Sequence, residues 1–228
     1  IDLMAKEEES SSKFSSSMSL FDDAIKYSLI VINDFENSIF FEDASYIIAR
    51  SSYYKNLLSP SSFYFKKILE NNKSPYYFDS LVRLGFINIE LKNTDDLVSI
   101  LNELDSNVLN FNENISYLKK KIPYKFLEYE LLNTTSNYFI LKAEWSKSNN
   151  NSPLSIESLY LKAIDAAITN NQKKDIYFKL IDFFQNLGDE GKILEYINQV
   201  KKLSNNSKRV TDKLPINFKW IGFIKLIL

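Results

Sequence analysis

Apolar residues recur along most of this chain at intervals of three and four, the spacing that places side chains on one face of an α-helix. The first clear case is "SLFDDAIKYSLIVINDF", whose shared apolar face consists of Leu20, Phe21, Ala24, Ile25, Leu29, Ile32 and Phe35. Ser19 ahead of the acidic Asp22 and Asp23 is typical of a helix N-terminus. Helices are therefore predicted from residue 19 onward, after a Ser-rich and weakly patterned segment at 1–18.

The same pattern predicts helix after helix to the end of the sequence, joined by short loops. The predicted ranges are 39–56, 59–72, 75–92, 94–105, 113–133 with a break at Pro123, 136–147, 154–170, 174–187, 190–203 and from about 214 onward. Pro60, Pro75 and Pro153 fall where a first helical turn tolerates a missing N–H. Gly188 and Asp189 suit a helix C-cap and the next N-cap. Such short loops require neighbouring helices to pack antiparallel.

One pair of predicted helices repeats in the next pair. A shift of 36 residues, near the period of about 34 expected for tetratricopeptide units, brings similar residues together through both helices. The matched pairs are Ser38 and Ser74, Phe40 and Tyr76, Phe41 and Tyr77, Asp43 and Asp79, Ile48 and Leu84, Ala49 and Gly85, and Phe65 and Leu101. In this interpretation Gly85 is the close-packing point between the two helices of one repeat.

Two segments resemble the tetratricopeptide repeat (TPR) family, namely "LVRLGFINIELKNTDDLVSILNEL" and "IYFKLIDFFQNLGDEGKILEYINQV". The first carries Leu81, Leu84, Gly85, Leu97, Leu101 and Leu104 at the family's spacing, and the second carries Tyr177, Leu180, Phe184, Gly188, Ile193, Ile197 and Val200. The chain departs from the family at Leu97 and Ile193, where Ala is usual, and at Ile181, where a small residue is usual. The resemblance implies an all-α fold, an α-α superhelix in which antiparallel helix pairs build a right-handed solenoid.

The match divides the chain into five segments. Residues 1–18 form a poorly patterned segment or a degenerate first helix, 19–107 hold TPR-like repeats, and 108–172 hold irregular helical pairs. A further TPR-like repeat covers 173–206, and 207–228 is a C-terminal helix. Two roles stay open for the apolar "INFKWIGFIKLIL", since it could cap the solenoid or continue into another domain.

The style of the repeats is also similar to that of bacterial outer-membrane assembly lipoproteins and Tol-Pal-associated cell-division coordinators. Two segments carry this similarity, "INDFENSIFFEDASYIIA" and "ENNKSPYYFDSLVRLG". In each, a turn is followed by an aromatic pair, an acid and a small residue. Those proteins hold partner proteins in the periplasm. The resemblance therefore favours a periplasmic or outer-membrane-associated location over a cytoplasmic one, and membrane contact through an N-terminal anchor beyond this sequence stays open.

Stacked helix pairs leave a concave surface lined mainly by their first helices, and the family uses this groove to bind protein or peptide. Carrying the groove positions onto matching residues implicates Asp43, Tyr46, Arg50, Tyr53, Asp79, Val82, Phe86, Ile89, Asp175, Phe178, Asp182 and Gln185. Aromatic and charged side chains together suit an extended peptide or a partner helix. Each of these residues also has a structural interpretation. Aromatic rings at helical spacing commonly fill the core, and an acid in the first turn of a helix is stabilised by the helix dipole.

A different TPR chemistry is not evident. Chaperone-binding members grip a C-terminal carboxylate with Lys and Asn, but the matching positions here hold Tyr46, Arg50, Val82, Phe86, Phe178 and Asp182. A co-chaperone role is therefore disfavoured, with Arg50 the one matching residue suited to an anion.

Composition removes several function classes. The chain has 4 Gly and 5 Pro among 228 residues, too few for a turn-rich β-sandwich, and its net charge of −1 favours neither nucleic acid nor an anionic membrane. It contains neither Cys nor His, which excludes thiolate nucleophiles, Cys-bearing metal centres and His-dependent triads. No cofactor, no metal and no enzyme activity are expected.

One basic cluster has two interpretations. Lys119, Lys120, Lys121 and Lys125 lie among aromatic residues in "YLKKKIPYKF", a combination that could contact phosphates and bases. A solvated helix end is the favoured explanation, because acids lie nearby and no basic stripe continues the cluster.

The leading prediction is a non-enzymatic scaffold that binds protein or peptide through the concave face. The alternative is a helical accessory domain of a larger cell-envelope assembly or enzyme, of which this chain is a fragment. A carboxylate-based hydrolase on a helical toroid is a third hypothesis, but no converging acids can be placed for it.

Overall fold

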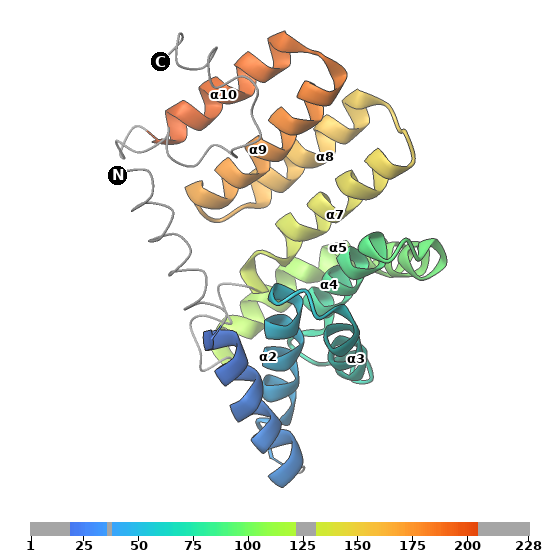
Figure 1. The fold of residues 1–228 in the computed structure, drawn as a ribbon, viewed down its shortest axis with the longest axis vertical. Coiled ribbons are helices and arrows are strands. Elements are labelled where there is room, and N and C mark those ends of the chain that lie inside the picture. Colours follow the sequence, from blue (N-terminus) through green and yellow to red (C-terminus); the bar gives the residue numbers. More distant parts are fainter. Residues whose placement is uncertain (1–18, 36–37, 122–130, 205–228) are drawn as a thin grey trace, which may run out of the picture.

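The computed structural model describes residues 19–35, 38–121 and 131–204, with side chains from 108 to 121 left out. All regular structure in these ranges is α-helical, which confirms the predicted all-α class (Figure 1). A first helix covers residues 19–34. The others are α2 (Phe41–Tyr54), α3 (Leu58–Leu69), α4 (Tyr77–Glu90), α5 (Thr94–Lys121), α7 (Thr134–Ser148), α8 (Pro153–Ala166), α9 (Asn170–Leu187) and α10 (Glu190–Ser204). None of the described helices is both long and apolar enough to cross a membrane.

Several helix ends follow from residues at their termini. Ser152 caps α8, with its side chain accepting a hydrogen bond from the Ser155 N–H and Pro153 following in the first turn. Gly188 adopts a left-handed conformation with φ 75° after α9, and the Asp189 side chain accepts from the Lys192 N–H at 3.0 Å. The predicted roles of Gly188 and Asp189 are therefore confirmed.

Several predicted boundaries are wrong. The end predicted at 170 lies four residues past the end of α8 at Ala166, and the start predicted at 113 lies inside α5. Two others have a clear cause. The predicted start of α9 at 174 is four residues late, because Thr169 and Gln172 form a capping box and the helix begins at Asn170. The predicted end at 105 is also wrong, since α5 continues to Lys121 as one helix of 28 residues (Figure 1). Neither Gly nor Pro occurs between Thr94 and Lys121, so nothing breaks it. The predictions at Pro123 and from 214 onward fall outside the described residues.

The helices pack as four hairpins, α2 with α3, α4 with α5, α7 with α8, and α9 with α10. The hairpins follow one another along the long axis of the molecule (Figure 1), where α3 packs on α4, α4 on α7 and α8 on α9. The starts of α2 and α4 lie 36 residues apart, as do those of α3 and α5 and those of α7 and α9. The predicted spacing of 36 residues therefore also occurs in the second half of the chain. It includes α7 and α8, which lie within 108–172, the segment predicted to hold irregular helical pairs.

All four first helices end in the same turn. Each is followed by a residue with positive φ, namely Asn56 at 58°, Lys92 at 56°, Asn150 at 54° and Gly188 at 75°. The next N–H then donates to a carbonyl five residues back: Leu57 to Ser52, Asn93 to Asn88, Asn151 to Ser146 and Asp189 to Phe184. This is the Schellman arrangement of a helix C-terminus. The four hairpins thus share their closing geometry, although only one has glycine there.

The core consists of three clusters that join each hairpin to the next. The first contains Tyr46, Phe65, Tyr76 and Leu84, the second contains Leu81, Val82, Leu97, Leu104 and Leu141, and the third contains Tyr160, Ile176, Leu180, Phe184 and Tyr196. Leu69 borders the first two clusters, whereas Phe86 and Phe139 border the last two. Partly buried side chains therefore connect the clusters into one continuous core.

Gly85 is a point of close approach, but its neighbour differs from the predicted one. A Cβ at Gly85 would meet the side chain of Leu141 on α7, whereas the sequence interpretation placed its contact within its own helix pair. Leu141 is fully buried, so it has little room to move. The missing Cβ therefore lets the first helices of two consecutive hairpins approach each other.

Substituting Gly85→Ala should destabilise the protein by about 1 kcal/mol. Overpacking against Leu141 costs about 1–3 kcal/mol, which outweighs the roughly 1 kcal/mol that alanine gains over glycine inside a helix. Urea unfolding followed by circular dichroism measures the difference. In a Leu141→Ala background the same change should become stabilising, because only the helix propensity remains. A loss of equal size in both backgrounds would contradict the contact.

Candidate functional site

The first helices of the first three hairpins meet at a buried polar group. The Tyr46 hydroxyl on α2 donates to Asp79 Oδ2 on α4 at 2.6 Å, and the Thr134 hydroxyl at the start of α7 lies 3.4 Å from Asp79 Oδ1. Arg83 Nε, one turn further along α4, lies 3.4 Å from Asp79 Oδ2. Asp79 is only 1% exposed. This carboxylate therefore serves three helices at once and neutralises a largely buried guanidinium.

The same combination of tyrosine, carboxylate and cation recurs along the molecule. Each hydroxyl donates to a carboxylate that also contacts lysine: Tyr138 to Asp105 with Lys142, Tyr160 to Glu144 with Lys147 and Lys179, and Tyr196 to Glu157 with Lys192. These contacts, with Tyr46 and Asp79, are called the tyrosine–carboxylate junctions below. Three of the four connect different hairpins, whereas Tyr160 and Glu144 belong to the same one. Sequence reasoning missed them, although Tyr46 and Asp79, like Asp105 and Tyr138, are separated by the same 33 residues.

Burial and neighbouring carboxylates change the acidity of the junction residues. Burial is the main reason why the pKa values of Tyr46, Tyr138, Tyr160 and Tyr196 are raised, and the adjacent carboxylates raise them further. Burial alone would also raise the pKa of Glu144, but Lys179, Lys147 and the Tyr160 hydroxyl outweigh it and lower that pKa. Burial and the hydrogen bond to Glu103 raise the pKa of Tyr77 to about 12.

These tyrosines predict alkaline unfolding. A tyrosine in the unfolded chain ionises near pH 10, whereas the junction tyrosines keep their protons above that pH in the folded chain. The stability that they contribute is therefore complete below about pH 10 and is lost as the pH rises toward the folded pKa values. We expect the part of the tyrosinate absorbance at 295 nm that comes from the junction tyrosines to rise together with the loss of helical circular dichroism. Tyrosinate absorbance that rises fully near pH 10 while the helices persist would contradict the junctions.

Three of the twelve predicted groove residues lie inside the protein. Tyr46 and Val82 are not exposed at all, and Asp79 is almost completely buried. The ring of Tyr46 stacks on Tyr76 with centroids 4.2 Å apart. Tyr46 and Val82 occupy the same position in consecutive repeats, so in both hairpins this position faces the core. The prediction that these three side chains contact a partner is therefore corrected.

The other nine predicted residues keep some exposure. On α2, Asp43 accepts a hydrogen bond from the Tyr76 hydroxyl, and the Arg50 guanidinium lies 5.4 Å from the centroid of the Tyr54 ring. Seven of the nine are half-buried, Asp43 among them. The other six are called the first-helix surface below: Arg50, Tyr53, Phe86, Ile89, Phe178 and Gln185. Asp175 and Asp182 on α9 are exposed. Nine of the twelve predicted residues thus keep some exposure, and they include both aromatic and polar side chains.

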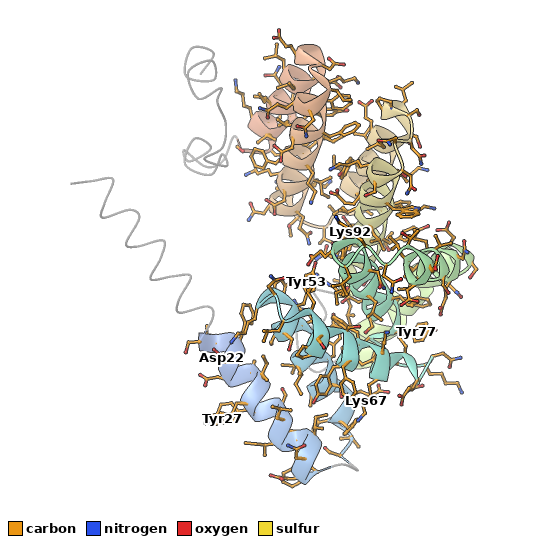
Figure 2. The ribbon with its side chains drawn as sticks, turned by 45° about the vertical axis from the view of Figure 1, so that its right-hand side comes forward. Asp22, Tyr27, Tyr53, Lys67, Tyr77 and Lys92 are labelled. Carbon is orange, nitrogen blue, oxygen red and sulfur yellow. The ribbon has the colours of Figure 1, made fainter. Side chains whose placement is uncertain are left out.

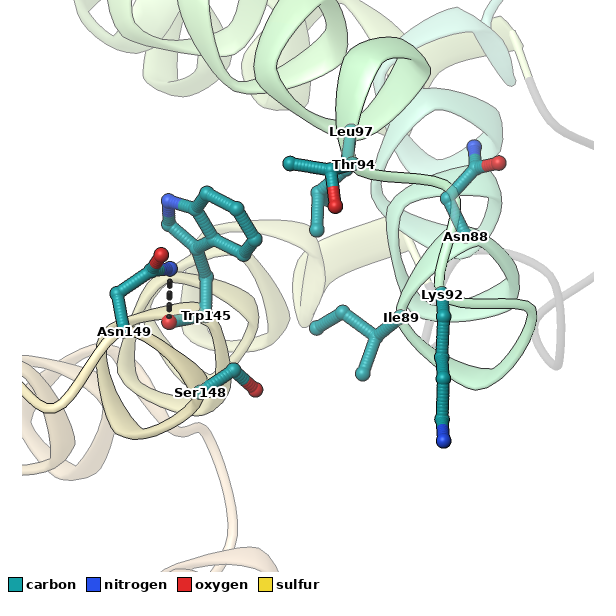
Figure 3. A pocket seen from close by; sticks show the side chains of 8 residues that line it. All are labelled: Asn88, Ile89, Lys92, Thr94, Leu97, Trp145, Ser148 and Asn149. Atoms are coloured by element: carbon teal, nitrogen blue, oxygen red, sulfur yellow. Dashed lines mark hydrogen bonds between the residues drawn. The ribbon is translucent and has the colours of Figure 1, made fainter.

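A pocket opens where α4, α5 and α7 meet, at the turn that closes the second hairpin (Figure 3). Its volume is about 190 Å³, and its lining consists of Asn88, Ile89, Lys92, Thr94, Leu97, Trp145, Ser148 and Asn149. Tyr53 and Lys92 lie near the centre of the molecule, and Asp22 and Tyr27 lie on the helix 19–34, whose Asp22 pairs with Lys55 just after α2 (Figure 2). Of the predicted groove residues only Ile89 lines this pocket. The sequence signal that pointed to this pocket was Trp145, the last aromatic residue of α7 before its closing turn.

The described residues contain no group of three or more acidic side chains that could hold a metal ion. The carboxylates of the tyrosine–carboxylate junctions accept hydrogen bonds from tyrosine and from lysine or arginine, which assigns them a structural role. No protein-family model and no curated protein sequence matches this chain significantly.

Proposed function

We propose that this protein is a non-enzymatic scaffold that binds a protein or peptide along the first helices of a right-handed, TPR-like solenoid. The observations that support this most are the shared closing turn of the four hairpins and the 36-residue spacing of their first helices within each half of the chain, from α2 to α4 and from α7 to α9. Hairpins of one geometry that pack on their neighbours build an extended surface with successive first helices side by side. Such a surface is suited to a long, narrow partner.

The chemistry of the first-helix surface fits this use. Phe86 and Phe178 are anchored against the core on one side and keep the rest of the ring accessible. Tyr53 lies under the Arg83 guanidinium, 5.8 Å from the ring centroid. Aromatic and arginine side chains in fixed positions are the residues that contribute most to protein interfaces, because little side-chain entropy is lost when they bind.

A site-specific cross-linking experiment tests the proposal. p-Benzoylphenylalanine is placed at Tyr53 or Phe178, and the protein is irradiated in its own cells. We expect a defined cross-linked partner from both positions. Phe63 on α3 serves as the matched control, because this aromatic residue is 61% exposed on a second helix. Equal cross-linking from Phe63, or none from the two first-helix positions, would reject the first-helix surface as the binding face.

The resemblance to bacterial outer-membrane-assembly and Tol-Pal-associated proteins extends the proposal to the cell envelope. Its support is the repeat style, in particular the aromatic pair and acid that follow each turn. In the structure the Tyr76 hydroxyl of one such pair donates to Asp43 of the preceding repeat. Those residues therefore hold consecutive hairpins together, a use that a stacked periplasmic scaffold requires. Fractionation of the source cells tests the location.

A further inference from the structure

The pocket beside Trp145 has the size of a single side chain. Sites for drug-sized ligands or cofactors usually enclose about 300–1,000 Å³, whereas this pocket encloses about 190 Å³. It lies at the junction of two hairpins and next to Ile89 of the first-helix surface (Figure 3). A peptide that runs along the first helices would therefore pass its opening. The volume favours one anchoring residue of such a peptide over a separate small molecule.

The walls are apolar and the rim is polar. Ile89, Leu97 and the Trp145 indole supply the apolar surface, which suits a bulky aliphatic or aromatic side chain. On the rim, Asn88 Nδ2 donates to the Leu84 carbonyl at 3.0 Å and Asn149 Nδ2 donates to the Trp145 carbonyl at 2.8 Å. Each amide nitrogen is thus held by its own helix.

The charge of the lining selects the residue beside the anchor. Lys92 is the charged residue among the described lining residues, and no described carboxylate lies within ion-pair distance of its ammonium group. The left-handed φ of 56° at Lys92 fixes this position in the closing turn. The three equivalent positions hold Asn56, Asn150 and Gly188, so the cation distinguishes this turn from the others. A carboxylate on the ligand would complement it.

We propose that this pocket binds one bulky apolar side chain, that of Leu, Ile, Met or Phe, from an extended peptide with an acidic residue next to it. The anchor fills the space between Ile89, Leu97 and Trp145, and the acid pairs with Lys92. This inference rests on the proposed scaffold function and names the residue pattern that the scaffold selects.

The experiment selects a phage-displayed library of random heptapeptides on the full chain carrying Trp220→Phe. Trp145 is then the sole tryptophan, and its emission reports occupancy of the pocket. We expect the enriched peptides to share an apolar residue beside Asp or Glu. Synthetic copies should shift the Trp145 emission and lose at least about tenfold in affinity when the apolar residue becomes Ala, the range of a hot-spot residue.

Matched variants separate the pocket from the rest of the surface, and their peptide affinity is measured by isothermal titration calorimetry because two of them carry a second tryptophan. Ser148→Trp fills the opening from the exposed end of α7, whereas Asn151→Trp adds the same ring to an exposed residue outside the lining. Lys92→Asn removes the charge with a side chain that tolerates positive φ, and Lys66→Asn removes a charge from the exposed face of α3. Only Ser148→Trp and Lys92→Asn should weaken binding, the latter for acidic peptides alone.

The two proposals fail in different ways. Peptides that bind Ser148→Trp as tightly as the parent, but respond to Arg50→Glu, would overturn the pocket and support the first-helix surface. Enriched peptides without an acidic residue, or with undiminished affinity for Lys92→Asn, would overturn the assigned pattern. A selection that enriches no peptide, together with no cross-linked partner at Tyr53 and Phe178, would overturn both proposals.

Discussion

Replacing Asp79 with alanine should lower the free energy of unfolding by about 3–5 kcal/mol, the usual cost of removing one partner of a buried ion pair. The loss has two sources. The Arg83 side chain, only 10% exposed, keeps its charge but loses the carboxylate that balances it. The Tyr46 hydroxyl, fully buried, loses its acceptor. Urea unfolding monitored by circular dichroism at neutral pH measures the change.

Two further variants locate the source of the Asp79 effect. Asp79→Asn keeps an acceptor for Tyr46 and removes the negative charge, so it should lie between the parent and alanine. Asp105→Ala breaks the matched contact with Tyr138 and Lys142, but the Asp105 side chain is 46% exposed. Water can replace its interactions, and the expected loss is at most about 1 kcal/mol. Equal losses for Asp79→Ala and Asp105→Ala would show that burial of the junction does not set its contribution.

Tyr160→Ala should cost about 3–5 kcal/mol, in the range of large-to-small aromatic substitutions in a core. The Tyr160 ring on α8 is fully buried in the cluster of the last two hairpins, and its hydroxyl donates to Glu144 on α7 at 2.8 Å. Removal leaves a cavity between these helices and takes a hydrogen bond from Glu144. The free energy of unfolding in urea is the measurement.

Tyr160→Phe separates the ring from the hydroxyl. It should cost only about 1 kcal/mol, since the cavity is not created and Glu144 keeps Lys147 and Lys179. A Tyr160→Phe variant as unstable as Tyr160→Ala would place the stabilisation in the hydrogen bond and not in packing. Stability of Tyr160→Ala within about 0.5 kcal/mol of the parent would instead contradict the burial of the ring.

Local signals were sufficient to predict the helices and their pairing. Apolar spacing, the prolines at helix starts and Gly188 predicted helix ends that agree with the structure within a few residues, except at α5. Most of the missed features are set by contacts between hairpins. The contact between Gly85 and Leu141 joins residues of different hairpins across an irregular interval, so no repeat alignment could supply it. The uninterrupted course of α5 was also missed, although neither Gly nor Pro interrupts it between Thr94 and Lys121.

The candidate site was less predictable for a related reason. Groove positions carried over from a family assume that each first helix presents the same face as in that family. Here Tyr46 reaches Asp79 on the next first helix, so this pair turns inward and becomes part of the core. Periodicity predicts which residues share a face, but it does not predict whether that face meets solvent or another helix. Arg50, Tyr53, Phe86 and Phe178 kept their exposure, whereas Tyr46, Asp79 and Val82 did not.

The shared closing turn determines how this chain tolerates change. Its left-handed position holds Asn, Lys, Asn and Gly in the four hairpins, which means that the backbone geometry is retained while the side chain varies. Mutational drift can therefore erase the sequence likeness between repeats without altering how each one ends. It also makes the hairpin a natural unit for duplication, deletion or exchange, because a cut before one first helix and after its partner leaves the neighbouring turns intact.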